Sequence, residues 1–190
     1  MSSQAARAER GAVGDGRGVG ARFAGGVVAG AVVVAVVAMT LAGCGTGTSA
    51  RVGSVGHPVP DIAGPAIGGG TFSLRALKGR WVVINFFATW CDPCKNEYPQ
   101  LVRFAGQHQG TAQVVGVVYE DRSADALRFH RAEGGTWPIV ADPSAQIADR
   151  YLVSALPQSF VIDPRGDLVA HIFGGVTVAK LDQALTAEPR

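Results

Sequence analysis

The sequence has 190 residues, of which 47% are hydrophobic, with 17 Lys and Arg against 15 Asp and Glu. This length and composition suit one globular domain with an appendage, and they exclude a wholly disordered chain. Residues 1–43 hold the whole net charge of +2, so we expect no nucleic-acid binding, which needs a basic surface to neutralise phosphates.

Residues 1–43 have the features of an export signal. Four arginines precede a nearly continuous run of Val and Ala over Val27–Leu41. The run ends in Leu-Ala-Gly-Cys, which resembles the bacterial lipobox, in which the cysteine is acylated and becomes the first residue after cleavage. We predict a signal peptide over 1–43, a lipid on Cys44 and a flexible tether over 44–56. An uncleaved transmembrane anchor is the alternative. Either way we expect a protein at the cell membrane, on its extracytoplasmic face.

Residues 57–190 are predicted to form one domain that begins with a hairpin. Gly68-Gly69-Gly70 marks the turn of this hairpin, and residues 74–79 form a short helical turn that ends at a glycine. An apolar run over 81–87 follows, as expected for a strand that is buried on both faces. A helix that starts around Pro93 comes next, because apolar residues recur there at helical spacing.

The rest of the domain alternates between strands and helices. Ser123 is the expected N-cap of the first helix in this part. We predict strands over 113–118, 137–140, 158–162 and 167–173, and helices over 123–129, 144–151 and 177–186. The predicted fold class is therefore α/β, with a mixed central sheet flanked by helices.

Two cysteines, Cys91 and Cys94, lie between the strand 81–87 and the next helix, in the stretch FFATWCDPCK. As a structural disulfide the pair would add little stability, because it closes a very short loop and the stabilisation from a disulfide grows with loop length. At a helix N-terminus, unpaired N–H groups and the helix dipole favour the nucleophilic thiolate of Cys91. Pro93 suits the first helical turn, and the carboxylate of Asp92 is expected to moderate the acidity of Cys91.

A CxxC pair can also serve haem attachment, metal binding or peroxide reduction. Haem attachment needs His after the second cysteine, where Lys95 stands, and a structural zinc site needs two further ligands at suitable spacing. A peroxide-reducing cysteine is expected to follow a Thr by three residues, but Ala88 occupies that place. A copper-binding chaperone with Cys91, Cys94 and His171 as ligands stays open, although His171 also fits the solvent-facing side of a strand.

Two motifs together resemble a known family. The stretch NFFATWCDPCKNEYP is similar to the motif of the thioredoxin superfamily, and specifically of the membrane-tethered TlpA/ResA-type thiol-disulfide oxidoreductases. The stretch LPQSFVIDPRGDLV looks like their second signature, the cis-proline loop with the hairpin after it. The likeness covers residues 57–190 and implies a thioredoxin-like fold with an N-terminal β-hairpin and a helix–strand insertion.

The resemblance implies roles for the cysteines and for the cis-proline loop. Cys91 would attack the partner's disulfide, and Cys94 would resolve the mixed disulfide. Pro157 would be the cis-proline opposite the pair, and the backbone at Leu156 would hold an extended substrate strand. Trp90 would shield the pair and offer a surface to partners, unless it packs in the core.

Asn85 and Glu97 mark a departure from cytoplasmic thioredoxins. There a buried acid occupies the place of Asn85 and helps to move the proton of the resolving cysteine, which an amide cannot do. Glu97 lies three residues after Cys94 on the same helix face, so it is the carboxylate near enough for that work. The family resemblance likewise implies an acid–base and specificity role for a Glu here.

The expected function is the reduction of protein disulfides without a cofactor. The resemblance suggests apocytochrome c, during cytochrome c maturation, as one substrate class, and a membrane electron donor would reduce the cysteine pair again. A disulfide-forming oxidase could use the same residues, because reduction potentials in this superfamily span about 150 mV and the sequence does not fix the value.

Overall fold

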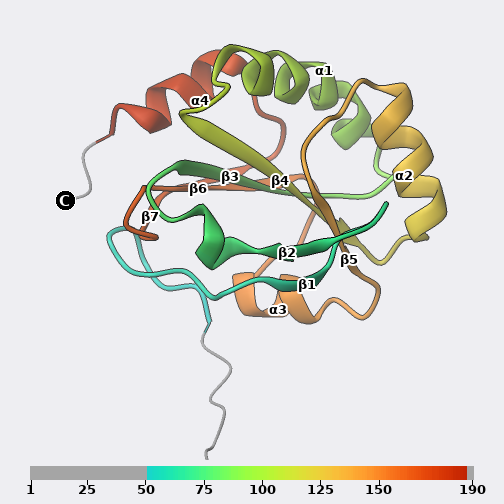
Figure 1. Cartoon of the computed structure of the whole chain (residues 1–190), viewed down its shortest axis with the longest axis horizontal. Helices are drawn as coiled ribbons and strands as arrows, with labels where there is room; N and C mark the ends of the chain where they lie inside the picture. Colours follow the sequence, from blue (N-terminus) through green and yellow to red (C-terminus); the bar gives the residue numbers. More distant parts are fainter. Residues whose placement is uncertain (1–50, 188–190) are drawn as a thin grey trace, which may run out of the picture. The chain divides into compact units, whose positions relative to one another are not determined.

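Figure 1 shows the computed structural model of the chain, in which residues 51–187 are described. The predicted signal peptide over 1–43, the predicted lipidation site Cys44 and most of the tether over 44–56 lie outside these residues. Within residues 51–187, no helix is both long enough and apolar enough to cross a membrane.

A five-stranded sheet with the order β5-β4-β3-β6-β7 forms the centre of the described domain. Its strands are β3 (Trp81–Phe87), β4 (Ala112–Tyr119), β5 (Ile139–Asp142), β6 (Gln158–Ile162) and β7 (Leu168–Phe173). Strands β3, β4 and β5 are parallel to one another, whereas β6 is antiparallel to β3 and to β7. The sheet is therefore mixed, as predicted.

Helices and a hairpin cover the two faces of this sheet. Figure 1 shows α1, α2 and α4 on one face, and α3 together with the hairpin β1–β2 on the other. These elements are α1 (Asp92–Gln107), α2 (Ser123–Ala132), α4 (Val178–Leu185), α3 (Gln146–Tyr151), β1 (Ala63–Pro65), β2 (Thr71–Ser73) and the 3-10 helix η1 (Leu74–Leu77). The arrangement is a thioredoxin-like α/β fold with the predicted N-terminal hairpin and the predicted α2–β5 insertion.

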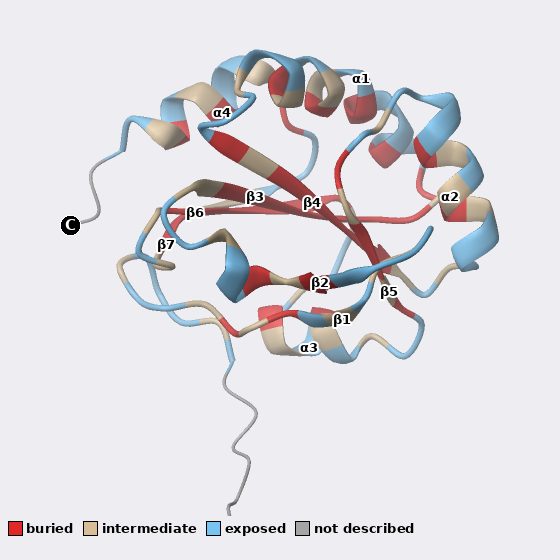
Figure 2. Cartoon of the chain, in the orientation of Figure 1, coloured by how far each residue is buried: buried red, intermediate tan, exposed pale blue. Residues whose placement is uncertain are grey.

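The central strand β3 separates two cores, because successive side chains of a strand point to opposite faces. Val83 and Phe87 belong to the core under α1, and Ile84 and Phe86 belong to the core over α3. Figure 2 shows the sheet strands largely buried between the two layers. Asn85 lies between Val83 and Phe87 on the strand, so its amide faces α1, the helix that carries the cysteines.

The predicted order of elements is confirmed, and some boundaries differ. The strand β5 begins at Ile139 and not at residue 137, because Pro138 has no N–H to donate and the buried ring of Trp137 packs on Tyr98, with ring centroids 5.3 Å apart. The prediction of Ser123 as an N-cap is wrong. Arg122 is the N-cap of α2, and Ser123 is its first residue.

Candidate redox-active site

The two cysteines lie where the buried strand β3 passes into helix α1. They form a disulfide, with their Cα atoms 5.3 Å apart. Cys91 is the N-cap of α1, and its Sγ accepts a hydrogen bond of 3.2 Å from the backbone N–H of Cys94. Cys91 is 6% exposed and Cys94 is fully buried. A partner therefore reaches Cys91 first, and the helix N-terminus that favours a thiolate is also at Cys91.

The two residues between the cysteines begin the helix. Asp92 is the first residue of α1 and Pro93 the second, where a missing N–H leaves no helical hydrogen bond unmade. The exposed carboxylate of Asp92 pairs with Nζ of Lys95 at 2.9 Å. The hydrogen bond and the charge of Lys95 lower the pKa of Asp92 below its ordinary value. Lys95 thus offsets part of the negative charge that was expected to act on Cys91.

Glu97 lies buried one turn after Cys94 on α1 and is held from two sides. Its Oε1 accepts a hydrogen bond of 2.7 Å from Nδ2 of Asn85, and its Oε2 accepts one of 2.7 Å from the backbone N–H of Val176. Burial raises the pKa of Glu97, although both hydrogen bonds and the charge of Lys180 oppose this shift. Glu97 is therefore a buried carboxyl group whose proton is held more tightly than in water.

The amide of Asn85 has a second partner that was not predicted from the sequence. Its Nδ2 also donates to Oγ of Ser159 at 3.0 Å. Ser159 lies opposite Asn85 in the antiparallel ladder between β3 and β6. With both hydrogens of its amide engaged, Asn85 is fixed in place and fixes Glu97 in turn. No local sequence signal identifies Ser159, since only the pairing of β3 with β6 brings it here.

Pro157 lies at the same end of the sheet as the cysteines. The peptide bond between Leu156 and Pro157 is cis, as the family resemblance implied. Gln158, the next residue, pairs with Phe86 near the end of β3, and the carbonyl of Pro157 accepts a hydrogen bond of 3.0 Å from Gly174 N–H. The structure therefore places the predicted substrate-holding loop at the strand end that leads into the cysteine pair.

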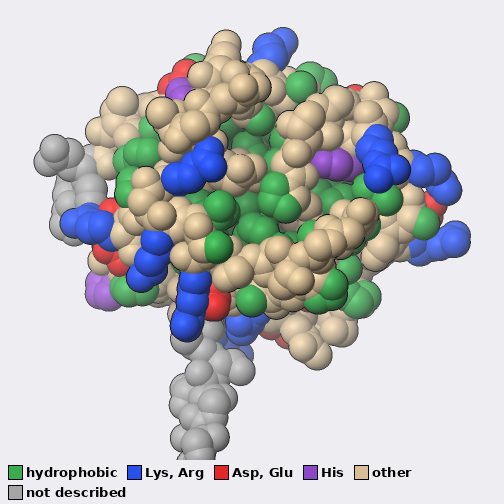
Figure 3. Space-filling view, in the orientation of Figure 1, with side chains coloured by type: hydrophobic (Ala, Val, Ile, Leu, Met, Phe, Trp, Pro, Cys, Tyr) green, Lys and Arg blue, Asp and Glu red, His purple; other side chains and the backbone are tan. Residues whose placement is uncertain are grey.

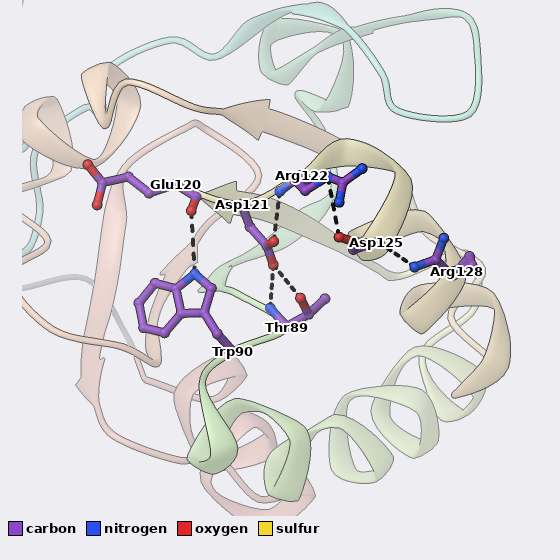
Figure 4. A network of polar contacts seen from close by, with 7 residues as sticks. All are labelled: Thr89, Trp90, Glu120, Asp121, Arg122, Asp125 and Arg128. Carbon is purple, nitrogen blue, oxygen red and sulfur yellow. Dashed lines mark hydrogen bonds and ion pairs between the residues drawn. The ribbon is translucent and has the colours of Figure 1, made fainter.

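Trp90 precedes Cys91 and stands largely in solvent, with 57% of its surface exposed. Core packing is thereby excluded for this residue. Its Nε1 donates to the carbonyl of Glu120 at 3.4 Å, and its ring lies edge-on to that of Tyr119, with centroids 6.4 Å apart. Figure 4 shows the indole beside the loop that follows β4. Trp90 thus offers an apolar surface next to the more accessible cysteine.

Asp121 holds the loop that carries Trp90 and Cys91, and this role was not predicted from the sequence. Its Oδ2 accepts hydrogen bonds of 2.6 Å from both the N–H and the Oγ1 of Thr89, and its Oδ1 accepts one of 2.7 Å from Arg122 N–H (Figure 4). Partial burial acts to raise the pKa of Asp121, but the hydrogen bonds from Thr89 and Arg122 outweigh it and lower this pKa. One signal was available: Asp121 follows a strand parallel to β3, where functional residues of parallel sheets gather.

His171 is separated from the cysteine pair, so the copper-site alternative is wrong. Its ring stacks on that of Phe160, with centroids 4.1 Å apart, and its Nε2 lies 2.7 Å from Oε1 of Gln158. Phe160 belongs to the core over α3, whereas both cysteines belong to the core under α1. The sheet therefore stands between His171 and the sulfur atoms. Nor is any group of three His, Cys, Asp or Glu side chains within residues 51–187 placed to hold a metal ion.

A disulfide at the N-terminus of a helix, next to a cis-proline loop and above a buried carboxyl group, is an arrangement for thiol–disulfide exchange. The fold and this site define a thioredoxin-fold thiol-disulfide oxidoreductase. The chain belongs to the AhpC/TSA family, whose model matches residues 55–171.

Two relatives of this chain are both named thiol-disulfide oxidoreductase ResA. The chain is 32% identical to the thiol-disulfide oxidoreductase ResA of Bacillus subtilis over 125 residues, which cover 65% of this chain and 70% of the relative. It is 30% identical to ResA of Halalkalibacterium halodurans over 138 residues, which cover 70% of this chain and 75% of the relative. The predicted ResA-type resemblance is confirmed.

Solved structures agree with these relatives. A thiol:disulfide interchange protein of the thioredoxin family from Chlorobium tepidum superposes with a TM-score of 0.64 at 26% identity, over 70% of this chain and 95% of that one. StoA from Bacillus subtilis superposes with a TM-score of 0.57 at 26% identity, over 65% of this chain and 95% of that one.

Proposed function

We propose that the protein is an extracytoplasmic, membrane-tethered reductant of protein disulfides, and that apocytochrome c is among its substrates. The observation that carries this proposal is the buried carboxyl group of Glu97, held by Asn85 one helical turn from Cys94. The ResA relatives support the chemistry, and the export signal with its lipobox supports the location.

The first step is an attack by the thiolate of Cys91 on one sulfur of the partner's disulfide. The bond between the partner's two sulfurs breaks, a mixed disulfide forms with Cys91, and the partner's other sulfur leaves as a thiolate. Cys91 takes this role because it is the more accessible sulfur and caps the helix. Trp90 and the backbone at Leu156, beside cis-Pro157, hold the partner's chain across the pair.

The second step releases the reduced partner. Cys94 loses its proton, its sulfur attacks Sγ of Cys91, and the partner's remaining sulfur leaves as a thiolate. The pair has then given two electrons to the partner and holds the disulfide that the structure contains. Glu97 accepts the proton of Cys94 in this step, since its raised pKa brings it closer to the pKa of a thiol than an exposed carboxyl group would be.

The charges around the pair support reduction of the partner as the direction of electron flow. A disulfide oxidoreductase becomes a strong oxidant when its reduced form, the thiolate, is stabilised. Here a buried carboxyl group lies near the pair and Asp92 adds a second negative charge, screened in part by Lys95. Both act against the thiolate, so they favour the disulfide form and a reducing potential. This distinguishes the proposal from the alternative of a disulfide-forming oxidase.

The location and the partners complete the proposal. Cleavage before Cys44 and acylation of this residue would attach the domain to the outer surface of the cell membrane through the tether over 44–56. A membrane electron donor with a dithiol would reduce the Cys91–Cys94 disulfide after each turnover. The mass and the N-terminal residue of the protein from the membrane fraction test the anchor: a mature chain that begins at an acylated Cys44 is expected, and a chain that keeps residues 1–43 would favour an uncleaved anchor.

A trapping experiment tests the function. In Cys94→Ser the second step is blocked, so partners remain bound to Cys91 as mixed disulfides that dithiothreitol releases. Apocytochromes with a CxxCH sequence are expected among the trapped proteins, and the double variant Cys91→Ser/Cys94→Ser is the control that should trap none. Recovery of misfolded secreted proteins alone would replace cytochrome c maturation by general disulfide repair.

A further inference from the structure

The ring of His171 lies on the face of the sheet away from the cysteines and is held between two phenyl rings. Phe160, its partner in the antiparallel ladder of β6 and β7, stacks on the imidazole, and Phe173 also packs on it, each with centroids 4.1 Å away. Two rings at this distance cannot share one side of the imidazole, so it lies between them. Phe160 is fully buried, whereas 68% of Phe173 is exposed. The core ring thus fixes the orientation of His171.

The amide of Gln158 connects His171 to the loop that leads into β6. Gln158 is 1% exposed, its Nε2 donates a hydrogen bond of 2.9 Å to the carbonyl of Ala155, and its Oε1 lies 2.7 Å from Nε2 of His171. A carbonyl oxygen can only accept, so the NH2 group of Gln158 faces Ala155 and its oxygen faces the ring. His171 therefore carries a hydrogen on Nε2 and donates it to Gln158.

The loop before β6 depends on this amide for its position. Within residues 51–187, no backbone-to-backbone hydrogen bond involves residues 154–156, and Gln158 donates the one side-chain hydrogen bond that reaches their backbone. Pro157 has no N–H, and its carbonyl accepts from Gly174, which follows β7. Gln158 and Gly174 thus fix the backbone on either side of Leu156, and the N–H and C=O of Leu156 are left for a partner's chain.

We propose that His171 is a positioning residue for the loop that binds the partner's chain. Its hydrogen bond fixes the amide of Gln158, and this amide fixes the carbonyl of Ala155, so that the backbone of Leu156 is in place before the partner arrives. Without the donor on His171, Oε1 of Gln158 would be buried and unpaired, which is costly, so the amide would turn and the loop would shift.

Single-turnover reduction of a peptide disulfide tests this role. The full chain, in neutral detergent micelles and reduced beforehand, is mixed with rising concentrations of an oxidised peptide that contains CxxCH, and the oxidised protein is counted after an acid quench. His171→Phe keeps a ring between the two phenyl rings and removes the donor. We expect the half-saturating peptide concentration to rise about fivefold, as for the loss of one hydrogen bond, while the limiting rate stays unchanged.

Two further variants separate positioning from stability. His171→Gln supplies an amide N–H in place of Nε2, so half-saturation should return towards the wild-type value although the ring is lost. His108→Phe is the matched control, because His108 also packs on a phenylalanine, Phe104 at 4.4 Å, and its Nε2 lies 2.8 Å from Oδ1 of Asp182. Histidine side chains lie apart from one another on the face that Figure 3 shows. His108→Phe should lower the urea midpoint but leave half-saturation unchanged.

A double variant shows whether His171 acts through Gln158. Gln158→Met removes the amide, so the further change His171→Phe should raise half-saturation no more, because the two residues act in one chain of contacts. Additive effects, an equal rise in His108→Phe, or an unchanged half-saturation in His171→Phe would each overturn the proposal. The role rests on the proposed exchange with an extended partner chain, and a wild-type chain that reduces hydroxyethyl disulfide but never the peptide would contradict that proposed function as well.

Discussion

Nδ2 of Asn85 donates a hydrogen bond of 2.7 Å to Oε1 of Glu97, and this contact ties the central strand β3 to the helix that carries the cysteines. Both residues are buried. In cytoplasmic thioredoxins a carboxyl group occupies the place of Asn85. In this protein the carboxyl group is that of Glu97 on the helix, and Asn85 on the strand donates a hydrogen bond to it.

Removal of the Glu97 charge is expected to make the thiols more acidic. In Glu97→Gln the carboxylate no longer opposes a thiolate, so the pKa values of the Cys91 and Cys94 thiols should fall while the rate of insulin reduction decreases. The pH dependence of alkylation by iodoacetamide measures the thiols. Glu133→Gln, at an exposed residue that follows α2, is the control. Unchanged thiol pKa values and rate in Glu97→Gln would contradict the role of Glu97.

The stability of the oxidised protein should depend on pH through Glu97. Burial raises the pKa of this group above its ordinary value of 4.5, so the folded state holds the proton more tightly than the unfolded state does. The stabilisation of the folded state by protonated Glu97 is therefore complete below pH 4.5, and it is lost as the pH rises through the pKa that Glu97 has in the folded state. Urea unfolding between pH 4 and pH 8 should show a steeper fall of the unfolding free energy in the wild type than in Glu97→Gln. Parallel curves would show that Glu97 is not buried as described.

An acid in place of Asn85 should not restore a thioredoxin-like site. In Asn85→Asp a second carboxyl group would stand against Glu97 with no donor between the two, and like charges in contact raise the pKa of one partner. We expect a loss of about 1–3 kcal/mol in unfolding free energy at pH 7, since a buried hydrogen bond is replaced by a repulsion. The loss should be smaller at pH 5 than at pH 7, because protonation of one of the two carboxyl groups, which removes the repulsion, becomes more favourable as the pH falls. Denaturant titrations at both pH values measure it, and an equal loss at both would contradict the coupling.

The sequence allowed the order of elements to be predicted because their signals are local. The apolar run over 81–87 and the turn Gly68-Gly69-Gly70 need no knowledge of distant residues. One of the two errors arose where a tertiary contact decides. Trp137 has strand propensity, but its ring fills the core beside Tyr98 and the strand starts two residues later. Ser123 is a good capping residue, but α2 already has Arg122 as its N-cap.

The site was predictable only as far as its motif extends along the chain. Cys91, Cys94 and Glu97 share one helix, and helical spacing alone places them together. Ser159 reaches Asn85 only through the register of β3 with β6, and Asp121 reaches Thr89 only because β4 ends beside β3. The separation of His171 from the site could not be predicted either. The two-residue period of a strand shows that successive side chains point to opposite faces of the sheet, but it does not show on which face the cysteines lie.

Asp121 is expected to position the loop of Cys91 without contact to the sulfurs. Asp121→Ala removes the acceptor of both Thr89 hydrogen bonds, so the loop should loosen and insulin reduction should slow several-fold, with a stability loss of about 1–3 kcal/mol. Faster hydrogen exchange of the Thr89 amide distinguishes this local effect from general destabilisation. Asp125→Ala is the matched control, since Asp125 pairs with Arg122 and Arg128 but not with Thr89 (Figure 4). Equal effects of the two variants would contradict the positioning role.

The reduction potential of the Cys91–Cys94 pair tests the central claim most directly. It is measured by equilibrating the purified protein with defined ratios of reduced and oxidised dithiothreitol or glutathione and counting free thiols. A reductant with carboxylates near its pair is predicted to lie well below the value of about −180 mV for protein disulfide isomerase, towards that of about −270 mV for thioredoxin. A potential near that of about −120 mV for DsbA would contradict the account and make the protein a disulfide-forming oxidase.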